Sequence, residues 1–335
     1  MSLHPNPLID PLAARAWLDS PKRAGSTPAQ TWLMGEVAQR LAEHLQVIRL
    51  EPESWLHWRA ARSGAEGETL LRARYPQARV LAGPGPGPVG AGPGAGGASS
   101  SPLPPQARAA GWLGAAWQRW RGWRADQGEL SPARAQERAS QEITPTQSGS
   151  TDLVWSNLTL HHESDPGLVM KTWLERLKPG GVVLFSCFGP DTLQELRELY
   201  RQKGWPPPMH PMTDMHDWGD LLVQSGFSEP VMDMERLTLH YQEVDTLVQE
   251  LRGLGANLHP GRVAHVRTRA WLGELTQALR SLARPSEGLG VPLTFEVIYG
   301  HAFKPDLAAP QMAVQAQTEI TLEAMRAQLL ARKKP

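Results

Sequence analysis

The chain has 335 residues, of which 41% are hydrophobic, enough to bury the core of one large domain or two ordinary ones. Its 34 Lys and Arg balance 34 Asp and Glu, so no overall field draws it to nucleic acid or to an acidic membrane. The single cysteine, Cys187, rules out an intrachain disulfide and fits a reducing compartment. Because neither a leader pattern nor a membrane-spanning apolar run is present, the sequence predicts a cytoplasmic protein without nucleic-acid or membrane partners.

The first 82 residues read as N-terminal helices followed by one strand–helix–strand unit. Apolar residues recur every four positions within residues 31–50, which predicts an amphipathic helix. The stretch “SWLHW” at 54–58 is a short strand candidate. It is followed by “AEGETLLRARYPQARVLA”, which predicts a helix closed by Pro76 and a strand from Ala78 to Ala82. This order and spacing are those of one βαβ unit.

The segment from 83 to 150 differs in composition from the rest of the chain. It opens with “GPGPGPVGAGPGAGGASSS”, whose prolines remove the N–H donors that a phosphate cradle uses, so we interpret it as a disordered insertion. Between 112 and 124, four tryptophans alternate with three arginines. This pattern suits either a helix packed on the domain or a segment that stacks on bases or a membrane surface, and we favour the packed helix.

The segment from 151 to 305 alternates between strand and helix patterns, and a helical tail follows at 306–335. The predicted strands are 152–156, 182–188, 236–241 and 292–299, and the predicted helices are 165–177, 213–227 and 243–255. Two βαβ units followed by an antiparallel pair of strands describe an open, mostly parallel α/β sheet. In such sheets the ligand lies beyond the carboxyl ends of the strands.

Three stretches of the second half carry a family resemblance. They are “FGPDTLQELR” (Phe188 to Arg197), “DMHDWGDLLVQSGFSEPVMDME” (Asp214 to Glu235) and “TFEVIYGHAFKP” (Thr294 to Pro305). With the “KPGG” before them, they resemble class I S-adenosylmethionine-dependent methyltransferases, and more narrowly the malonyl-acyl-carrier-protein O-methyltransferases of biotin synthesis. The resemblance implies a doubly wound, seven-stranded, Rossmann-like sheet with S-adenosylmethionine as cofactor. It also implies that the acceptor is the free carboxylate of a malonyl group on acyl carrier protein.

The turn after the first strand departs from the family pattern. The family cradle is Asp/Glu-x-Gly-x-Gly-x-Gly, because the backbone must pass close to the cofactor. This chain has “SWLHWRAARSGAEG” there, with Arg59 and Arg62 in the turn and only Gly64 and Gly67 after it. The second strand ends in “RVLAGPG”, which contains no acid to hold the ribose hydroxyls. We therefore expect S-adenosylmethionine to bind weakly to the isolated protein.

Candidate cofactor-binding residues follow from the resemblance and from the ends of the strands. Gly64 remains from the cradle, and Asp126 stands where the family acid contacts the adenine amino group. Asn157 follows the strand at 152–156, where it either faces the methionine end of the cofactor or forms a turn. No CxxC pattern appears, and the adjacent His161 and His162 lack the spacing of a metal-binding pair, so we predict no metal.

Candidate residues for the acceptor are arginines, because a guanidinium can bind a carboxylate through two hydrogen bonds. Arg197, Arg252 and Arg262 have this potential. Tyr241 is a further catalytic candidate that faces either the core or the pocket.

Two functions remain open at this point. One is a methyltransferase for malonyl-acyl carrier protein, and the other is a pseudo-methyltransferase that serves as a binding or regulatory partner. Under either, acyl carrier protein is expected to dock on the basic residues near “RELYRQKG”, namely Arg197, Arg201 and Lys203.

Overall fold

The computed structural model describes residues 9–19, 32–83, 148–263, 268–283 and 290–306, together with the backbone of 106–107. The predicted Trp/Arg helix, Asp126 and the C-terminal tail helix lie outside the described residues, as does nearly all of the Gly/Pro insertion.

One mixed sheet organises the chain, in the order β2-β1-β4-β5-β7-β6-β3. Its longer strands are β1 (Ser54–His57), β2 (Arg79–Ala82), β4 (Thr151–Ser156), β5 (Leu177–Phe188), β6 (Ser228–Tyr241) and β7 (Val291–Phe303). Strands β2, β1, β4 and β5 are parallel, and β7 runs antiparallel to both β5 and β6. The predicted α/β sheet and its antiparallel C-terminal pair are confirmed. Beyond these six strands, the described residues add only the two-residue β3 (Gln106–Ala107), which pairs with β6.

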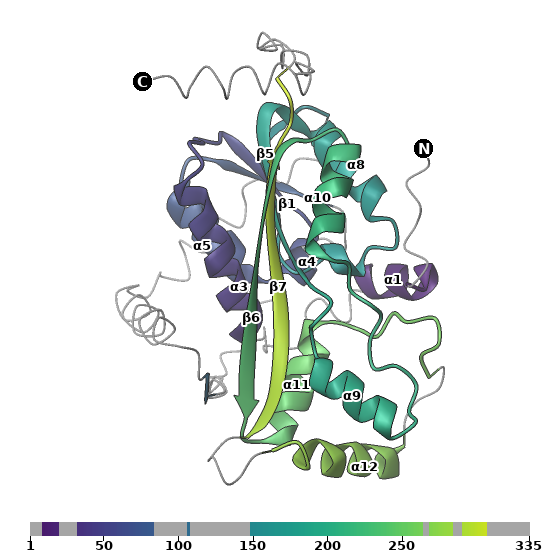
Figure 1. The fold of residues 1–335 in the computed structure, drawn as a ribbon. Helices are drawn as coiled ribbons and strands as arrows, with labels where there is room; N and C mark the ends of the chain where they lie inside the picture. The colour runs from purple at the N-terminus through teal and green to yellow at the C-terminus, as the bar shows by residue number, and fades with distance from the viewer. Residues whose placement is uncertain are drawn as a thin grey trace, which may run out of the picture.

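Helices cover both faces of this sheet (Figure 1). On one face lie α3 (Trp32–Glu43) and α5 (Ala65–Arg74), and on the other lie α8 (Pro166–Arg176) and α10 (Met215–Gln224). A third group gathers at the carboxyl end of the parallel strands, where it forms a cap: α9 (Gln194–Gln202), α11 (Val244–Leu254) and α12 (Arg269–Arg280). The remaining short helices are α1 (Pro11–Leu18), η1 (His44–Gln46), α4 (Ala60–Ser63) and η2 (Leu160–His162).

Local capping explains where the two helices of the second face begin. The Asp165 side chain accepts the Leu168 N–H at 2.9 Å, and Pro166 occupies the first position of α8. The Asp214 side chain accepts the His216 N–H at 2.8 Å at the start of α10, and these hydrogen bonds lower the pKa of Asp214. Asp214 and His216 are thus parts of a helix cap.

The core is divided by the sheet into two layers. Val182 to Phe188 of β5 are buried without interruption, as expected for a central strand covered on both faces. Trp55 and Trp155 belong to the layer beneath α3, whereas Trp173 and Trp218 belong to the layer beneath α8 and α10. Cys187 is fully buried in β5, as predicted, and burial raises the pKa of its thiol.

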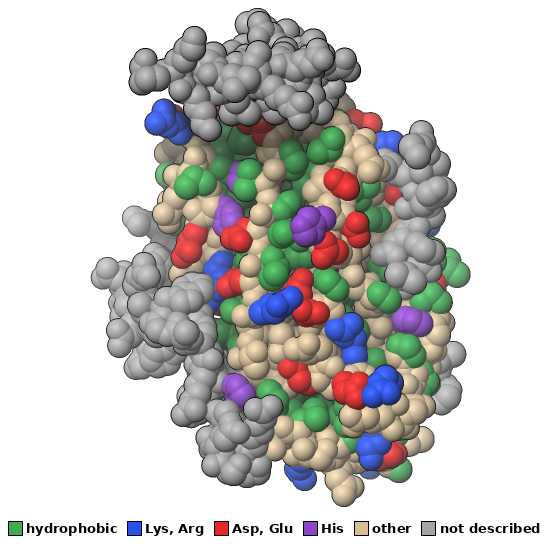
Figure 2. All heavy atoms as spheres, in the orientation of Figure 1, with side chains coloured by type: hydrophobic (Ala, Val, Ile, Leu, Met, Phe, Trp, Pro, Cys, Tyr) green, Lys and Arg blue, Asp and Glu red, His purple; other side chains and the backbone are tan. Residues whose placement is uncertain are grey.

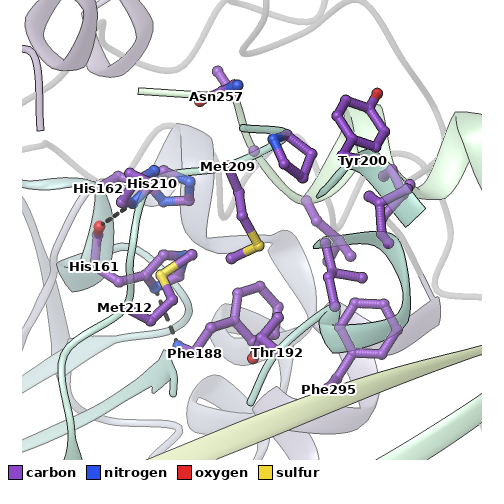
Figure 3. A pocket seen from close by; sticks show the side chains of 17 residues that line it. His161, His162, Phe188, Thr192, Tyr200, Met209, His210, Met212, Asn257 and Phe295 are labelled. Atoms are coloured by element: carbon purple, nitrogen blue, oxygen red, sulfur yellow. Dashed lines mark hydrogen bonds between the residues drawn. The ribbon is translucent and has the colours of Figure 1, made fainter. Parts of the chain in front are cut away.

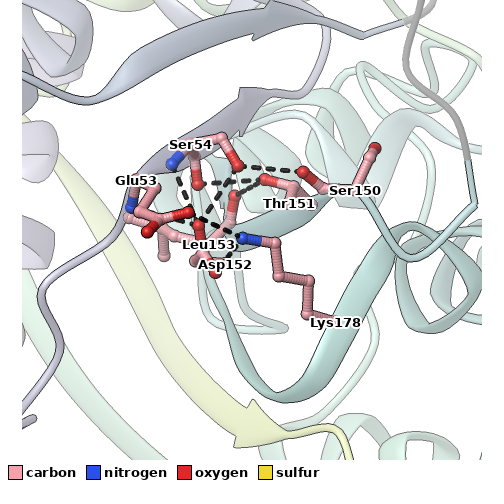
Figure 4. A network of polar contacts seen from close by, with 7 residues as sticks. All are labelled: Glu53, Ser54, Ser150, Thr151, Asp152, Leu153 and Lys178. Atoms are coloured by element: carbon pink, nitrogen blue, oxygen red, sulfur yellow. Dashed lines mark hydrogen bonds and ion pairs between the residues drawn. The ribbon is translucent and has the colours of Figure 1, made fainter.

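The amino ends of β1, β4 and β5 are joined by a network around Asp152 (Figure 4). Its carboxylate accepts the Ser54 N–H at 2.9 Å and the Ser54 hydroxyl at 3.1 Å, and it pairs with Lys178 Nζ at 2.8 Å. The ion pair raises the pKa of Lys178. Asp152 therefore fixes strand register at the edge opposite the ligand-binding edge.

The structure differs from the predicted elements in several places, and β6 begins eight residues before the predicted strand 236–241. The helix expected over 31–50 ends at Glu43 and continues as the short η1. Helices α1 and α12 were not predicted, because each packs on residues far away in the sequence. Trp17 of α1 shares a small core with Leu258, and Trp271 of α12 lies 5.8 Å from Trp205 between ring centroids.

Candidate functional site

The turn after β1 is occupied by arginine side chains and their partners. Arg59 has a φ of 49°, in the left-handed region, and begins α4. Its guanidinium pairs with Glu163 at 2.9 Å and with Asp19 at 3.0 Å. Trp58 beside it is buried, and its ring makes an edge contact with Trp173 at 5.7 Å between centroids. The turn is therefore anchored on both sides by protein groups.

Helix α1 covers this turn through Trp17. The Arg62 guanidinium lies 4.4 Å from the centre of the Trp17 ring and donates a hydrogen bond to the Trp17 carbonyl. The other neighbour of the Trp17 ring is His162, which stacks at 4.3 Å between centroids. Trp17 thus joins the turn after β1 to the region that follows β4.

The described residues at this turn do not form a cofactor cradle. A Cβ added at Gly83, just after β2, would lie 2.7 Å from the His57 carbonyl oxygen and 3.0 Å from the Trp58 Cα, so the ends of β1 and β2 are in direct contact. Gly64 has a φ of 85° and packs against Met34 and Glu66. Two arginines stand where the family pattern has glycines, and the described residues at the end of β2 include no carboxylate. Within the described residues, the turn after β1 is thus occupied by arginine side chains and their partners.

Asn157, at the carboxyl end of β4, is held by a buried network. Its side-chain amide donates to the carbonyls of Met34 and Ser63, both at 3.1 Å, and its Oδ1 accepts the Ser186 hydroxyl at 2.8 Å. The Ser63 hydroxyl accepts the Asn157 N–H at 3.1 Å. The network connects α3, α4, β4 and β5 at the edge of the sheet where ligands bind.

A cavity of about 180 Å³ lies between this edge of the sheet and the cap (Figure 3). Phe188 and Phe295 contribute from β5 and β7, and Leu196 and Tyr200 contribute from α9. Met209 extends into the middle of the space. Among the described residues that line it there is no Asp, Glu, Lys or Arg. The cavity therefore offers an apolar enclosure with a few neutral polar groups, as expected for a small acyl group.

Three buried imidazoles form one wall of the cavity: His161 and His162 from η2, and His210 from the segment before α10. The ring centroids of His161 and His162 are 4.1 Å apart, and those of His162 and His210 are 5.8 Å apart. Burial lowers the pKa of His161 and His162 well below 6.5 and also lowers that of His210, with mutual repulsion adding to the effect on His161 and His162. The empty cluster is therefore neutral at pH 7.

The predicted acceptor arginines lie outside this cavity. Arg197 donates to the Pro190 carbonyl at 2.6 Å, Arg252 is exposed on α11, and Arg262 pairs with Asp10 at 2.8 Å. Tyr241 is a core residue whose hydroxyl donates to Glu250 at 3.4 Å, and burial raises its pKa. None of these four side chains is among the described residues that line the cavity.

The sequence reasoning missed the histidine wall. His161 and His162 follow β4 at the expected edge, and this position was a readable signal, but they were considered only as a metal-binding pair. His210 joins them from a distant segment and carried no signal of its own. Within the described ranges, no group of three His, Cys, Asp or Glu side chains is arranged to hold a metal ion. No helix in those ranges is both long and apolar enough to cross a membrane.

Comparison with known proteins identifies the family. A family profile described as a methyltransferase domain matches residues 118–185. The malonyl-[acyl-carrier protein] O-methyltransferase of Gallionella capsiferriformans is 34% identical over 83% of this chain and 86% of that protein. The protein of the same name from Laribacter hongkongensis is 34% identical over 82% of this chain and 83% of that protein. Among solved structures, the YcgJ protein from Bacillus subtilis aligns with 80% of this chain and 98% of its own, at 12% identity and a TM-score of 0.43. The chain belongs to the family of malonyl-[acyl-carrier protein] O-methyltransferases.

Proposed function

We propose that this protein methylates the free carboxylate of malonyl-acyl carrier protein, with S-adenosylmethionine as the methyl donor, as a step of biotin synthesis in the cytoplasm. The observation that carries the proposal is the 34% identity to relatives of that name over more than four fifths of the chain. Nothing in those relatives favours the binding-only alternative over an enzyme.

The cavity beside the histidine wall suits the acceptor side of this reaction. A bound donor would supply a methyl group already activated on a sulfonium, so the chain has mainly to position the carboxylate and to exclude water. Apolar residues of β5, β7 and α9 enclose the space, and the neutral imidazoles form one of its walls. We assign the malonyl end of the substrate to this cavity.

The carrier itself would dock outside the cavity, on the cap. Arg201 and Lys203 at the end of α9 are exposed, as are Arg252 of α11 and Arg280 of α12. Acyl carrier protein is an acidic partner, and exposed cations near the mouth of the pocket would attract it and orient its arm. Acidic and basic side chains are otherwise interspersed on the face that Figure 2 shows. We expect the docking to rest on these few cations rather than on a broad basic field.

The proposal is tested with the full chain, malonyl-acyl carrier protein and S-adenosylmethionine labelled in its methyl group. We expect label in an alkali-labile ester on the carrier, and none on acetyl-acyl carrier protein, which has no free carboxylate. Tight binding of malonyl-acyl carrier protein without ester formation would instead support the binding-only alternative. Absence of both binding and ester formation would overturn the assignment to this substrate.

A further inference from the structure

The histidine wall presents a chemical problem for an acid substrate. A carboxylate that enters the cavity meets no described lysine or arginine, only neutral side chains. Burying an unpaired anion in such a place is costly, so the site needs a source of positive charge. The three imidazoles are the groups in the described lining of the cavity that can gain a positive charge, and one ring nitrogen of each is buried without a hydrogen-bond partner.

Backbone contacts fix the proton of two of these rings. His161 Nδ1 accepts the Phe188 N–H at 3.3 Å, so the neutral ring carries its proton on Nε2, which is an unpartnered donor. His210 Nε2 lies 2.9 Å from the His161 carbonyl oxygen and donates to it, so its Nδ1 is an unpartnered base. The cluster therefore combines one unpartnered hydrogen-bond donor, His161 Nε2–H, with one unpartnered proton acceptor, His210 Nδ1.

The same contacts decide which ring can gain a proton. Protonation of His161 on Nδ1 would bring its new N–H into contact with the Phe188 N–H and break the hydrogen bond between them. Protonation of His210 on Nδ1 leaves its bond to the His161 carbonyl intact and strengthens it. Of these two rings, His210 is the better placed to become an imidazolium, and the charge of Arg62 disfavours protonation of the third ring, His162.

We propose that His210 binds the acceptor carboxylate by taking up one proton as the substrate enters, while His161 Nε2–H provides a second hydrogen bond. This inference rests on the proposed function and deepens it, because it names the groups that recognise the acid. In the binding step, a carboxylate and one proton from solvent enter together, and no covalent bond changes.

The surrounding charges are consistent with a single proton. Burial and the nearby His259 lower the pKa of His210, whereas its hydrogen bond to the His161 carbonyl favours the protonated ring. Arg62 lowers the pKa of the neighbouring His162. The acid closest in sequence to the wall, Glu163, pairs with Arg59 and is not free to balance an imidazolium. The substrate carboxylate is therefore the anion that would stabilise the added charge.

This arrangement also separates substrate from product. The methyl ester carries no charge, so after transfer the imidazolium of His210 loses its partner and returns its proton to solvent. A permanent arginine would remain charged in the same situation. We expect the site to retain the acid and to release the ester.

The test measures protons directly and does not require turnover. Calorimetric titration of the full chain with malonyl-acyl carrier protein, in two buffers of different ionisation enthalpy, gives the number of protons taken up. We expect about one proton near pH 7 and none with the methyl ester of the same carrier. Affinity for the acid should fall by up to about tenfold for each unit by which the pH rises. This fall should begin above the pKa of His210 in the free protein, which lies below 6.5, and end at the pKa of His210 in the complex.

The variant that isolates the effect is His210→Gln, which keeps a donor for the His161 carbonyl but cannot be charged. It should lose the proton uptake and bind the acid about 10-fold or more weakly, because a charge-assisted hydrogen bond is lost. His301→Gln is the matched control, since His301 is a buried histidine on β7 outside the cavity lining. It should retain the uptake.

The outcomes separate this inference from the proposed function. Binding of malonyl-acyl carrier protein without proton uptake, or unchanged uptake in His210→Gln, would overturn the role of His210 and leave the substrate assignment standing. Failure of the wild-type chain to bind the carrier would count against the proposed function itself. Circular dichroism of each variant checks that a loss of binding is not a loss of folding.

Discussion

The turn after β1 and the cavity beyond β4 and β5 lie at the same edge of the sheet, and Trp17 contacts both, yet they are built differently. The turn is filled by Arg59 and Arg62, whose charges are already matched by Asp19, Glu163 and the Trp17 ring. The cavity is lined by apolar side chains, by the neutral polar residues Thr192, Tyr200 and Asn257, and by three histidines that each have one unpartnered ring nitrogen. The described residues thus leave a cavity beside η2, whereas Arg59 and Arg62 with their partners fill the turn after β1.

This difference implies that the turn after β1 and the cavity beyond β4 and β5 can be altered independently. The acceptor cavity is formed by β5, β7, α9 and the loops before α10 and after α11, where the family resemblance is strong. The donor turn is formed by β1, α4 and α1, where the cradle pattern is missing. Changes that act on one region should therefore leave the other measurably intact.

The largest effect is expected from filling the cavity. Met209 extends into its middle, so Met209→Trp should occupy the space that the malonyl group needs. We expect turnover of malonyl-acyl carrier protein to fall by about 100-fold or more, because the carboxylate can no longer reach its position. Affinity for S-adenosylmethionine should be unchanged in a titration, and an equal loss of both would show that the two regions overlap.

The second effect concerns Asn157, which sits between the two regions. Asn157→Ala removes hydrogen bonds to two carbonyls and to Ser186 in a fully buried place, so we expect a loss of about 2–4 kcal/mol in the free energy of unfolding. Urea denaturation measures it. If Asn157 instead served mainly as a cofactor contact, affinity for S-adenosylmethionine would fall while stability stayed the same.

The third effect is a pH dependence of the free energy of unfolding that arises from the buried histidines of the cavity wall. The folded pKa of His161 and His162 is depressed well below 6.5, so their neutral forms are favoured in the folded chain. Stability is fully present above pH 6.5 and is lost as the pH falls below it, because the unfolded chain then binds protons that the folded chain does not. The slope of the free energy of unfolding against pH should approach about 1.4 kcal/mol per pH unit for each histidine.

Urea denaturation between pH 7.5 and 5.5 measures this slope, and His162→Gln should reduce it by about one histidine's share. A wild-type stability that is flat over this range would contradict the neutral cluster.

The fourth effect comes from reopening the donor turn. Arg59→Gly with Arg62→Gly removes two side chains from the cradle position and relieves the left-handed conformation of residue 59. We expect S-adenosylmethionine, whose binding to the wild type should be in the millimolar range, to bind about tenfold more tightly. Arg72→Ala, at a half-buried position of α5 where Arg72 pairs with Glu68, is the control and should leave the affinity for S-adenosylmethionine unchanged. Micromolar binding by the wild type would show that the closed turn is not the donor site.

The sequence predicted the elements whose signals are local. The apolar run of β5 and the alternation in β7 identify strands wherever they pack, and the proline and glycines of “KPGG” mark the end of α8 close to where it lies. The loss of the cradle was readable for the same reason, since it depends on residue types at one turn. Helix α1 was not readable, because its buried residues pack on partners that are distant in the sequence, such as His162 and Leu258.

The site was predictable in position but not in composition. The edge of the sheet follows from topology, so the turn after β4 was singled out as a candidate ligand position, and the structure places the cavity beside it. The arginine candidates were chosen because a carboxylate favours a guanidinium, but Arg197 is engaged with Pro190 and Arg252 lies on the surface. The histidine wall depends on His210 reaching the His161 carbonyl from 49 residues away, and no local pattern reveals such a contact.

The smallest effect concerns the docking of the carrier on the cap. Reversing Arg201 and Lys203 to Glu places acid where the carrier's own acidic surface approaches, so the Michaelis constant for malonyl-acyl carrier protein should rise about three- to tenfold. The effect is modest because exposed charges are screened and Arg201 already pairs with Glu198 at 2.6 Å. It should shrink as salt is raised from 50 to 300 mM, whereas the maximal rate should not change. Lys171→Glu, an exposed reversal on α8 away from the cap, is the control. If both variants weaken binding equally, the carrier is attracted by overall charge alone, and α9 is not its docking site.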